Sequence, residues 1–495
     1  MKKVIPTLKI SAWIAILLFS IQFSNAQVGI NTTSPDASSM LDVTSTTKGM
    51  LTPRMTTLEK NAISSPANAL LVYDTTLNAF SYYDLPTTKW VNMESGRNNF
   101  KRIKATDVLA TVLADELAAG GGTKYLLQTN TLYEINGTVV VNLPIELNDA
   151  YVTGLDSGDD KLVKMSGDLF TGATGGSIRV LTLVSLGNVF NITGTGTQNL
   201  ILRDCIIANS GNVGLVKNFS MVFLSIIQYV GNTNGVIYED IGRLLLSNTG
   251  WFGGGPPLGN SGTYEKLVGT FDLVQKQGGF SEVYGTSIGF DVSSNPTINF
   301  DAVMESVVFS GTNIAGYVKP YTVGTYSGYN FNINWNVRCA GIPNETDSNA
   351  GGGFSMDYGV GTGISVSTNS SNPSNIVKVG TLATVSPASN LFRFSSDNPN
   401  RLRYLGKKKR IFQVSGSISV QVPNAATYIV YIAKNGSALS QYKVYGRGQT
   451  NGDILVLPLD GNIELNYNDF VEIFLQRYTG SLTDPIVANL TVIIK

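Results

Sequence analysis

The sequence has 495 residues with 35 basic and 35 acidic side chains, so its formal net charge is zero and gives no sign of a nucleic-acid partner. It contains no histidine, which excludes Ser-His, Cys-His and His-metal chemistry and leaves carboxylates, Lys, Arg and Tyr for any catalysis. Charged residues make up 14% of the chain and glycine is abundant, a composition typical of strands and turns, and the length predicts roughly two to four modules.

The first 26 residues have the pattern of a secretory signal peptide. Three lysines precede an apolar run at 10–23, and the small residues Ser24 and Ala26 fit a cleavage site before Gln27. Because the residue after the cut is not Cys, we expect no lipid anchor, and no later segment is long and apolar enough to span a membrane. The sequence therefore predicts a mature protein that starts at Gln27 and is secreted or displayed on the cell surface.

Residues 27–95 form a first small module. Its apolar residues come in short bursts between Ser, Thr, Asn and Pro turns, and "ALLVYDTTLNAFSYYD" predicts a β-hairpin around residues 75–78. About 70 residues with so few core side chains rarely fold alone, so we expect oligomerisation or packing on a neighbour to supply the missing burial.

Three blocks of this module carry a family resemblance: "QVGINTTSPDASSMLDV", "KGMLTPRMTTLEKNAI", and "LLVYDTTLNAFSYYD" followed by "KWVNM". In this order and spacing they resemble a recurrent N-terminal piece of Bacteroidetes secreted proteins and of tail-fibre-like proteins from their phages. The resemblance implies an attachment module linked to export or to a fibre, and it does not imply an enzyme.

Residues 96–123 are predicted to be a linker that holds one amphipathic helix, over 105–122. Thr106 can cap the start of this helix and Gly120 can end it. Its apolar side chains recur at helical spacing: Val108, Leu109, Val112, Leu113 and Leu117. Because an open stack of strands invites aggregation at its bare end, we expect this helix to cover the strand array that follows.

A repeat appears from about residue 124 onward. Gly-Asn pairs begin at Gly187, Gly211 and Gly231, and an apolar triplet follows each of them. The triplets, which stand 22 residues apart, are Leu200-Ile201-Leu202, Val222-Phe223-Leu224 and Leu244-Leu245-Leu246. Imperfect periods in the twenties are typical of a solenoid, with Gly-Asn corners and stacked apolar strands.

The sequence therefore predicts a right-handed parallel β-helix over 124–385. Within it we expect the triplets to face inward, so that Leu245→Asp would unfold the solenoid. The periodicity weakens after residue 260, and the segment 332–354 either closes the solenoid or bridges to the last domain.

The tail, residues 386–495, has the rhythm of an antiparallel sandwich. "IFQVSGSISVQV" alternates strictly, and "YIVYIAKNGSAL" places a hairpin turn at Asn435 and Gly436. One face of the first strand collects its apolar residues: Phe412, Val414, Ile418, Val420 and Val422. With "LPLDGNIELNYNDFVEIFL" and a closing apolar strand, the tail resembles the trimeric jelly roll of the complement and tumour-necrosis-factor superfamily. The resemblance implies a tip domain that holds a homotrimer.

Acidic residues of the solenoid are the candidates for catalysis, because a glycosidase needs two carboxylates roughly 5–10 Å apart. The acids in question are Asp204, Glu239, Asp240, Asp272, Glu282 and Asp291. They match no specific catalytic motif, so solvated or turn-capping acids are the simpler interpretation.

Three further features have a structural and a functional interpretation. "DSGDDK" at 156–161 offers oxygen ligands for calcium but lacks the length of a known loop, so a polar turn is favoured. The basic run at 406–410, near Arg401 and Arg403, is either a solvated turn or a contact for anionic glycans or phosphate. Cys205 and Cys339 are expected to be separately buried thiols, with a disulfide as the alternative.

Together these features predict an exported, non-catalytic, fibre-like or adhesin-like homotrimer that binds a surface glycan or receptor and requires no cofactor. No catalytic, cofactor-binding or metal-ligating residue is assigned. The alternative is a carbohydrate-active β-helix enzyme, a polysaccharide lyase or hydrolase that acts through carboxylates. A phage-derived component adopted by a cell is a third possibility, and the predicted signal peptide favours a cell-encoded, exported version.

Overall fold

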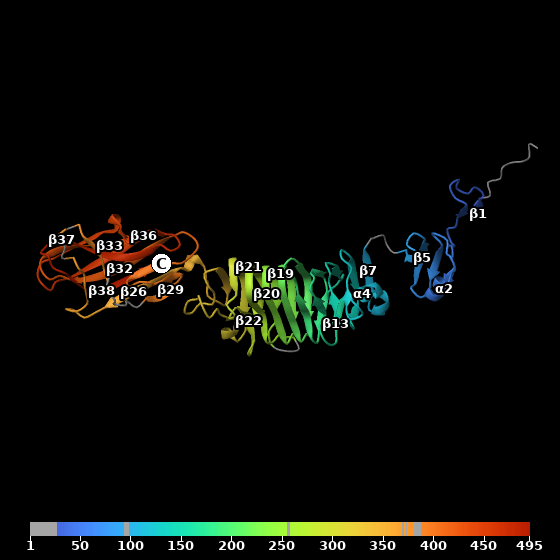
Figure 1. Ribbon diagram of the computed structural model, residues 1–495, viewed down its shortest axis with the longest axis horizontal. Helices are drawn as coiled ribbons and strands as arrows, with labels where there is room; N and C mark the ends of the chain where they lie inside the picture. Colours follow the sequence, from blue (N-terminus) through green and yellow to red (C-terminus); the bar gives the residue numbers. More distant parts are fainter. Residues whose placement is uncertain (1–26, 94–98, 255–257, 369–370, 373, 381–387) are drawn as a thin grey trace, which may run out of the picture. The chain divides into compact units, whose positions relative to one another are not determined.

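The computed structural model describes most of the chain, and Figure 1 shows its strands and helices. The described residues are 27–93, 99–254, 258–368, 371–372, 374–380 and 388–495. The chain divides into two compact units, Met1–Asn98 and Asn99–Lys495. The predicted signal peptide, residues 1–26, lies outside the described residues, and within them no helix has the length and apolarity needed to cross a membrane.

The first unit is a small mixed fold. Its strands and helix are β1 (Val28–Ile30), β2 (Leu41–Val43), β3 (Arg54–Met55), α2 (Thr57–Asn61), β4 (Leu71–Asp74), β5 (Ala79–Asp84) and β6 (Lys89–Asn92). The pair β1–β2 is parallel, and β3–β4–β5–β6 form a second sheet. Antiparallel pairing of β4 with β5 confirms the predicted hairpin. Thr56 and Glu59 start α2 with a reciprocal capping box.

Burial in this first unit is sparse, as the sequence predicts. Val72 is the one large apolar side chain that is buried among the unit's described residues. Several others stay exposed, namely Val28, Ile30, Met40, Leu41, Met50, Leu51 and Leu58. The ion pair of Lys60 with Asp74, 2.7 Å long and buried, adds a polar contact to this small core. So much exposed apolar surface on so small a unit is typical of a segment that packs against another chain.

The second unit begins with a 19-stranded sheet whose strand pairs are all parallel among the described residues, and these strands form the stacked coils of a β-helix (Figure 1). Its strands are β7 (Phe100–Lys104), β8 (Tyr125–Leu126), β9 (Leu132–Asn136), β10 (Thr138–Val140), β11 (Ile145–Glu146), β12 (Tyr151–Thr153), β13 (Lys161–Lys164), β14 (Phe170–Gly172), β15 (Gly176–Arg179), β16 (Thr182–Ser185), β17 (Asn188–Thr193), β18 (Asn199–Ala208), β19 (Asn212–Val230), β20 (Asn234–Trp251), β21 (Thr263–Glu282), β22 (Ile288–Asp291), β23 (Thr297–Ser310), β24 (Val318–Lys319) and β25 (Trp335–Ala340). The predicted all-β fold class is confirmed.

The 22-residue repeat is the register of neighbouring coils. Leu200 pairs with Val222 and Val222 with Leu244, as the triplet spacing predicts. The direction predicted for the middle residue is wrong, however. Leu244 and Leu246 are buried, whereas Leu245 is only half-buried. Side chains alternate along a strand, so the outer members of each triplet face the core and the middle member faces outward.

Corners of the coils fall at residues in the left-handed conformation. One column of corner residues, all with positive φ, runs through Asp204, Ile226, Asn248, Gly278 and Ser306. The predicted Gly-Asn corners are correct only at Gly231, since Gly187 and Gly211 do not have positive φ. Asn and Asp tolerate this conformation because their short side chains bond locally, and this accounts for the acids found at corners.

The predicted helix at 105–122 is present as two short helices, α3 (Leu109–Val112) and α4 (Ala114–Ala119). The helix breaks at Leu113, whose φ of −108° and ψ of 35° are not helical. Leu109 and Leu113 belong to the β-helix core, so the helices cover the first coils as expected, while Val108 is exposed.

A sandwich of two antiparallel sheets completes the second unit. Its strands are β26 (Gly351–Asp357), β27 (Ile364–Ser365), β28 (Ile376–Lys378), β29 (Ala388–Phe392), β30 (Phe394–Ser395), β31 (Arg401–Tyr404), β32 (Arg410–Gln421), β33 (Ala426–Lys434), β34 (Ser437–Ala438), β35 (Val444–Gly448), β36 (Ile454–Leu465), β37 (Phe470–Gly480) and β38 (Ile486–Ile494). One sheet has the order β29-β26-β38-β32-β36; the other runs β30-β31-β37-β33, with β34 and β35 both paired to β33. The two sheets form an antiparallel sandwich.

Two features predicted for the tail, the apolar face of its first long strand and a hairpin turn, are present in this sandwich. The five apolar residues predicted to share a face of β32 and the turn after it are all buried. Asn435 and Gly436 have φ of 51° and 77° between β33 and β34, as the predicted hairpin turn requires.

The limits of these domains differ from the predicted ones. Parallel coils start at Phe100 and end at Ala340, and the sandwich starts at Gly351, where 124–385 and 386–495 were expected. The segment 332–354 both closes the solenoid and bridges to the last domain, since it contains the last coil strand, β25, and the start of the first sandwich strand, β26. Between them lies the one-turn helix η2 (Asp347–Asn349); the other two are η1 (Ile314–Gly316) and η3 (Ser440–Tyr442).

Candidate functional site

A groove of about 420 Å³ runs across four consecutive coils of the β-helix. Strands β17, β19, β20 and β21 line it in two outward rows that their register aligns. The first row is Asn188, Asn212 and Asn234; the second is Asn191, Leu215, Ile237 and Lys266. Stacked coils thus place three asparagine amides beside a row that is partly apolar.

Hydrogen bonds within the protein hold these amides in place. Asn188 and Asn191 donate from Nδ2 to the two carboxylate oxygens of Asp168, over 2.6 and 2.8 Å. Asn234 donates to Oδ1 of Asn212 over 3.0 Å. Each side-chain amide therefore uses either its oxygen or its nitrogen in a hydrogen bond to the protein. Among the described residues, its other polar atom is left for solvent or a ligand.

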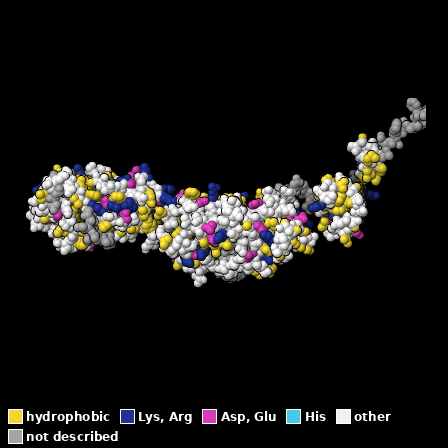
Figure 2. Space-filling view, viewed as in Figure 1, with side chains coloured by type: hydrophobic (Ala, Val, Ile, Leu, Met, Phe, Trp, Pro, Cys, Tyr) yellow, Lys and Arg dark blue, Asp and Glu magenta, His cyan; other side chains and the backbone are white. Residues whose placement is uncertain are grey.

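Fixed amides beside exposed aliphatic side chains suit a sugar, which offers hydroxyls on its edges and C–H groups on its faces. Ile237 is 38% exposed in this groove and provides such an aliphatic surface. On the face of the β-helix seen in Figure 2, most of the surface is uncharged, with acids and bases in small mixed groups. This part of the surface therefore suits a glycan better than a nucleic acid.

The sequence analysis assigned Asn188 and Asn212 to corners as parts of Gly-Asn pairs, and it therefore missed the groove. The usable signal was their spacing, because Asn212 and Asn234 are separated by the same 22 residues as the apolar triplets. An outward asparagine and a corner asparagine look alike in sequence, and the coil register is needed to tell them apart.

Five of the six solenoid acids accept hydrogen bonds or form ion pairs within the protein. Asp240 accepts from the Thr270 N–H, Asp272 from the Asn299 amide, and Glu282 from the Gly253 N–H. The others that do so are Glu239, 2.7 Å from Lys217, and Asp291, which bonds Ser293 and lies 3.7 Å from Lys319.

Asp204, the sixth, is a corner residue. None of the six lines the groove. The turn-capping interpretation therefore describes the positions of these acids better than a catalytic pair does.

The acidic turn at 156–161 is a structural cap. Asp160 accepts backbone N–H groups from Gly137, Leu155 and Asp156. Burial opposes ionisation, but these three donors bring the pKa of Asp160 below its ordinary value. The described residues contain no cluster of His, Cys, Asp or Glu suited to a metal, and the favoured polar turn fits this geometry.

The cysteines are free and both are buried, as the sequence favoured. Burial raises the pKa of the Cys205 thiol to about 11 and also raises that of Cys339. Neither thiol is a reactive thiolate at neutral pH.

The basic run 406–410 lies where the last coils meet the sandwich. Lys407 donates to the Phe300 carbonyl and lies 3.2 Å from the Asp301 carboxylate, and the Lys408 N–H donates to Asp347. Arg401 and Arg403, by contrast, pair inside the sandwich, with Glu472 and Asp397. Part of the run is thus structural, and a cavity lies beside it.

Glu345 is the most perturbed acid of this junction. Its carboxylate is 1% exposed and accepts the backbone N–H groups of Asn330 and Phe331 over 2.7 and 2.9 Å. Burial raises the pKa of Glu345 to about 7, against the lowering effect of these donors and of Arg393.

This pKa predicts a loss of stability as the pH rises. The folded state holds the Glu345 proton more tightly than the unfolded chain, where the pKa is near 4.5, so the contribution is complete below about 4.5 and is lost as the pH passes 7. Because the chain has no histidine, we expect this side chain to dominate between pH 5 and 8, by up to about 3 kcal/mol. Unfolding in urea across this range measures it; Glu345→Gln should flatten the curve, and a flat wild-type curve would contradict the assignment.

Comparison with known proteins gives one family match and a set of similar structures, of which two are described here. Residues 29–107 match the family model described as the phage tail like trimerisation region. No curated protein is detectably similar to the chain. The enzymatically active domain of tailspike protein 4 from bacteriophage CBA120 is similar in structure, with 9% identity, 90% of this chain and 77% of that chain covered, and a TM-score of 0.33. A tailspike protein of the Acinetobacter baumannii bacteriophage Fri1, titled a capsular polysaccharide depolymerase, has 8% identity, 89% and 98% coverage and a TM-score of 0.24.

The prediction that the chain is not an enzyme is contradicted, since the titles of both of these structures describe those proteins as catalytic. That prediction depended on the missing histidine and on the absence of familiar motifs. Carboxylates alone are sufficient for glycoside hydrolysis, so neither absence excludes activity.

Proposed function

We propose that this chain is an exported, trimeric, tail-fibre-like protein that binds a surface glycan in the groove of its β-helix. The observation that carries the proposal is the groove itself, in which asparagine amides held by the protein lie beside aliphatic side chains. The proposal places the glycan on the rigid coils, because a site built on strands is positioned more firmly than a site on loops.

Trimerisation is supported by two independent observations. Residues 29–107 match a trimerisation region of phage tail-like proteins, and the same part of the chain leaves many apolar side chains exposed. The sandwich adds a second surface, because Ile411, Val456 and Ile493 of its first sheet are 66%, 67% and 48% exposed. We expect light scattering of the full secreted chain to give three times the monomer mass, and a monomer at micromolar concentration would contradict this part of the proposal.

Cleavage of the bound glycan is the second candidate function. One of the similar structures is titled a capsular polysaccharide depolymerase. The same experiment tests both functions: the secreted protein is incubated with a panel of bacterial capsular, algal and plant polysaccharides. Binding is read by co-sedimentation or calorimetry, and cleavage by new reducing ends or unsaturated sugars.

A groove variant ties binding to this surface. Asn212→Ala removes one ligand-facing amide and the acceptor that holds Asn234, so we expect affinity for the bound polysaccharide to fall about 5- to 10-fold. Gln228→Ala, an exposed change on the same strand outside the groove, is the control. Equal affinities for the two variants would place the glycan elsewhere.

A further inference from the structure

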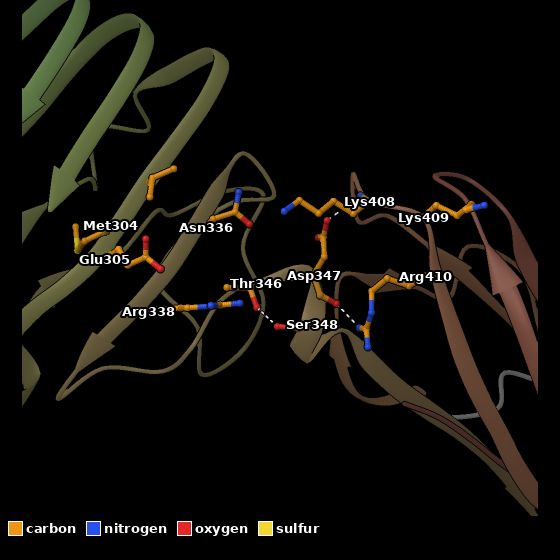
Figure 3. A pocket seen from close by; sticks show the side chains of 11 residues that line it. Met304, Glu305, Asn336, Arg338, Thr346, Asp347, Ser348, Lys408, Lys409 and Arg410 are labelled. Atoms are coloured by element: carbon orange, nitrogen blue, oxygen red, sulfur yellow. Dashed lines mark hydrogen bonds between the residues drawn. The ribbon is translucent and has the colours of Figure 1, made fainter.

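A second cavity, of about 420 Å³, lies between the last coils of the β-helix and the base of the sandwich (Figure 3). Strands β23 and β25 supply Glu305, Asn336 and Arg338 on one side. The basic run before and at the start of β32 supplies Lys408, Lys409 and Arg410 on the other. Its volume falls within the range of about 300–1,000 Å³ typical of small-ligand sites.

The lining of this junction cavity has a surplus of positive charge. Four cationic side chains, Arg338, Lys408, Lys409 and Arg410, stand against two acids, Glu305 and Asp347. Asp347 is already neutralised from outside the cavity, because the buried Arg393 forms an ion pair with its carboxylate.

Two of the cations are available to a ligand. Arg338 and Lys408 are exposed, and neither side chain has a hydrogen-bond or ion-pair partner among the described residues. Lys409 contacts only the exposed Glu464 within the described part of the chain, at 3.2 Å, a surface pair of low energy. Glu305 lies opposite Arg338 in the strand register and forms no ion pair with it in the structure.

The cavity is also held in shape. Arg393 joins Asp347 to the carbonyl groups of Trp335 and Glu345, all in the buried junction. Asp347 in turn accepts the Lys408 N–H over 2.8 Å, and its carbonyl accepts from Arg410. Because these contacts fix the basic run to the last coil, an anion would meet cations that are already in position.

We propose that this junction cavity binds the acidic group of an anionic saccharide, with Arg338 and Lys408 as the ligands of a carboxylate or sulfate. Arg is suited to such planar and tetrahedral oxyanions because it donates from a rigid fork. Asn336 and Ser348 add neutral polar groups for the sugar hydroxyls. The inference rests on the proposed glycan-binding function and extends it by naming charge as a determinant of specificity.

The test uses the full secreted protein and three probes of equal length: an oligogalacturonate, a sulfated carrageenan oligosaccharide and a neutral cello-oligosaccharide. Calorimetry at low and at moderate salt compares wild type with Arg338→Gln, Lys408→Gln and the double variant. Arg243→Gln, an exposed arginine of β20 that lines neither cavity, is the matched control. Circular dichroism checks that every variant is folded.

We expect at least one acidic probe to bind more tightly than the neutral probe and to weaken at least tenfold in the double variant, but not in the control. Which acidic probe binds tells carboxylate from sulfate. Weakening by the same factor in Arg243→Gln, or no binding of either acidic probe, would overturn the inference.

Including Asn212→Ala in the same calorimetry separates this inference from the proposed function. If Asn212→Ala weakens polysaccharide binding while the junction variants do not, the groove stands and the junction site fails. If the junction variants alone weaken binding of the acidic probe, the junction site stands and the groove fails.

Discussion

Leu244→Asp is expected to unfold the β-helix, whereas Leu245→Asp, one residue further along the same strand, is expected to leave it folded. Leu244 is fully buried and pairs with Val222 on one neighbouring coil and Val274 on the other. A carboxylate there loses the packing of a core leucine and is buried without a partner, which together cost at least about 4 kcal/mol. Leu245 is half-buried and faces outward, so its replacement costs little.

Thermal melting followed by circular dichroism distinguishes the two variants. We expect the transition of Leu244→Asp to fall by well over ten degrees or to disappear, and that of Leu245→Asp to stay close to wild type. Because the two substitutions are identical and adjacent, chemistry and sequence context are matched. Equal melting of both variants would show that the inward and outward rows have been assigned wrongly.

The register of the coils could be predicted from the sequence, but the direction of each side chain could not. A spacing of 22 residues aligns Leu200, Val222 and Leu244 because each coil repeats the one before it. Which members of each triplet face the core is a separate question. The outward row also carries apolar residues, Phe223 and Leu245, so hydrophobicity alone does not mark which members of the triplet face the core.

The end of the solenoid was harder to predict because the coils grow longer. Leu244 pairs with Val274, Val274 with Ala302, and Ala302 with Trp335, so the spacing departs from 22 residues and the repeat fades from the sequence. The extra residues lie in loops, which tolerate insertion because closing a longer loop costs little free energy. The strands themselves remain in parallel register to Ala340.

Both cavities depend on contacts that a single sequence does not reveal. The groove needs the coil register to bring Asn188, Asn212 and Asn234 into one row. The junction cavity needs Arg338 of the last coil to face Lys408 of the sandwich, a pairing of residues 70 positions apart. The sequence did show the basic run at 406–410. It did not show that Arg338 of the last coil faces this run.

Lys276→Met is expected to destabilise the β-helix by about 3–5 kcal/mol, although it replaces a charged residue by an apolar one in a core. Lys276 Nζ lies 3.0 and 2.9 Å from the two carboxylate oxygens of Glu265 and donates to Thr249. The side chains of the pair are 2% and 0% exposed, and Trp251 also donates to Glu265. Removing the lysine leaves a carboxylate buried without a countercharge, and its desolvation then dominates.

Two variants show whether the missing countercharge is the cause. Adding Glu265→Gln to Lys276→Met removes the stranded charge but keeps an acceptor for Trp251, so we expect the double variant to recover most of the lost stability. Lys217→Met breaks an exposed ion pair with Glu239 on the neighbouring coils, and because water screens this pair we expect stability to change little. Denaturant unfolding of all three measures these differences. If the double variant were as unstable as Lys276→Met, the loss would come from packing around residue 276, and the ion pair would not be what this part of the core requires.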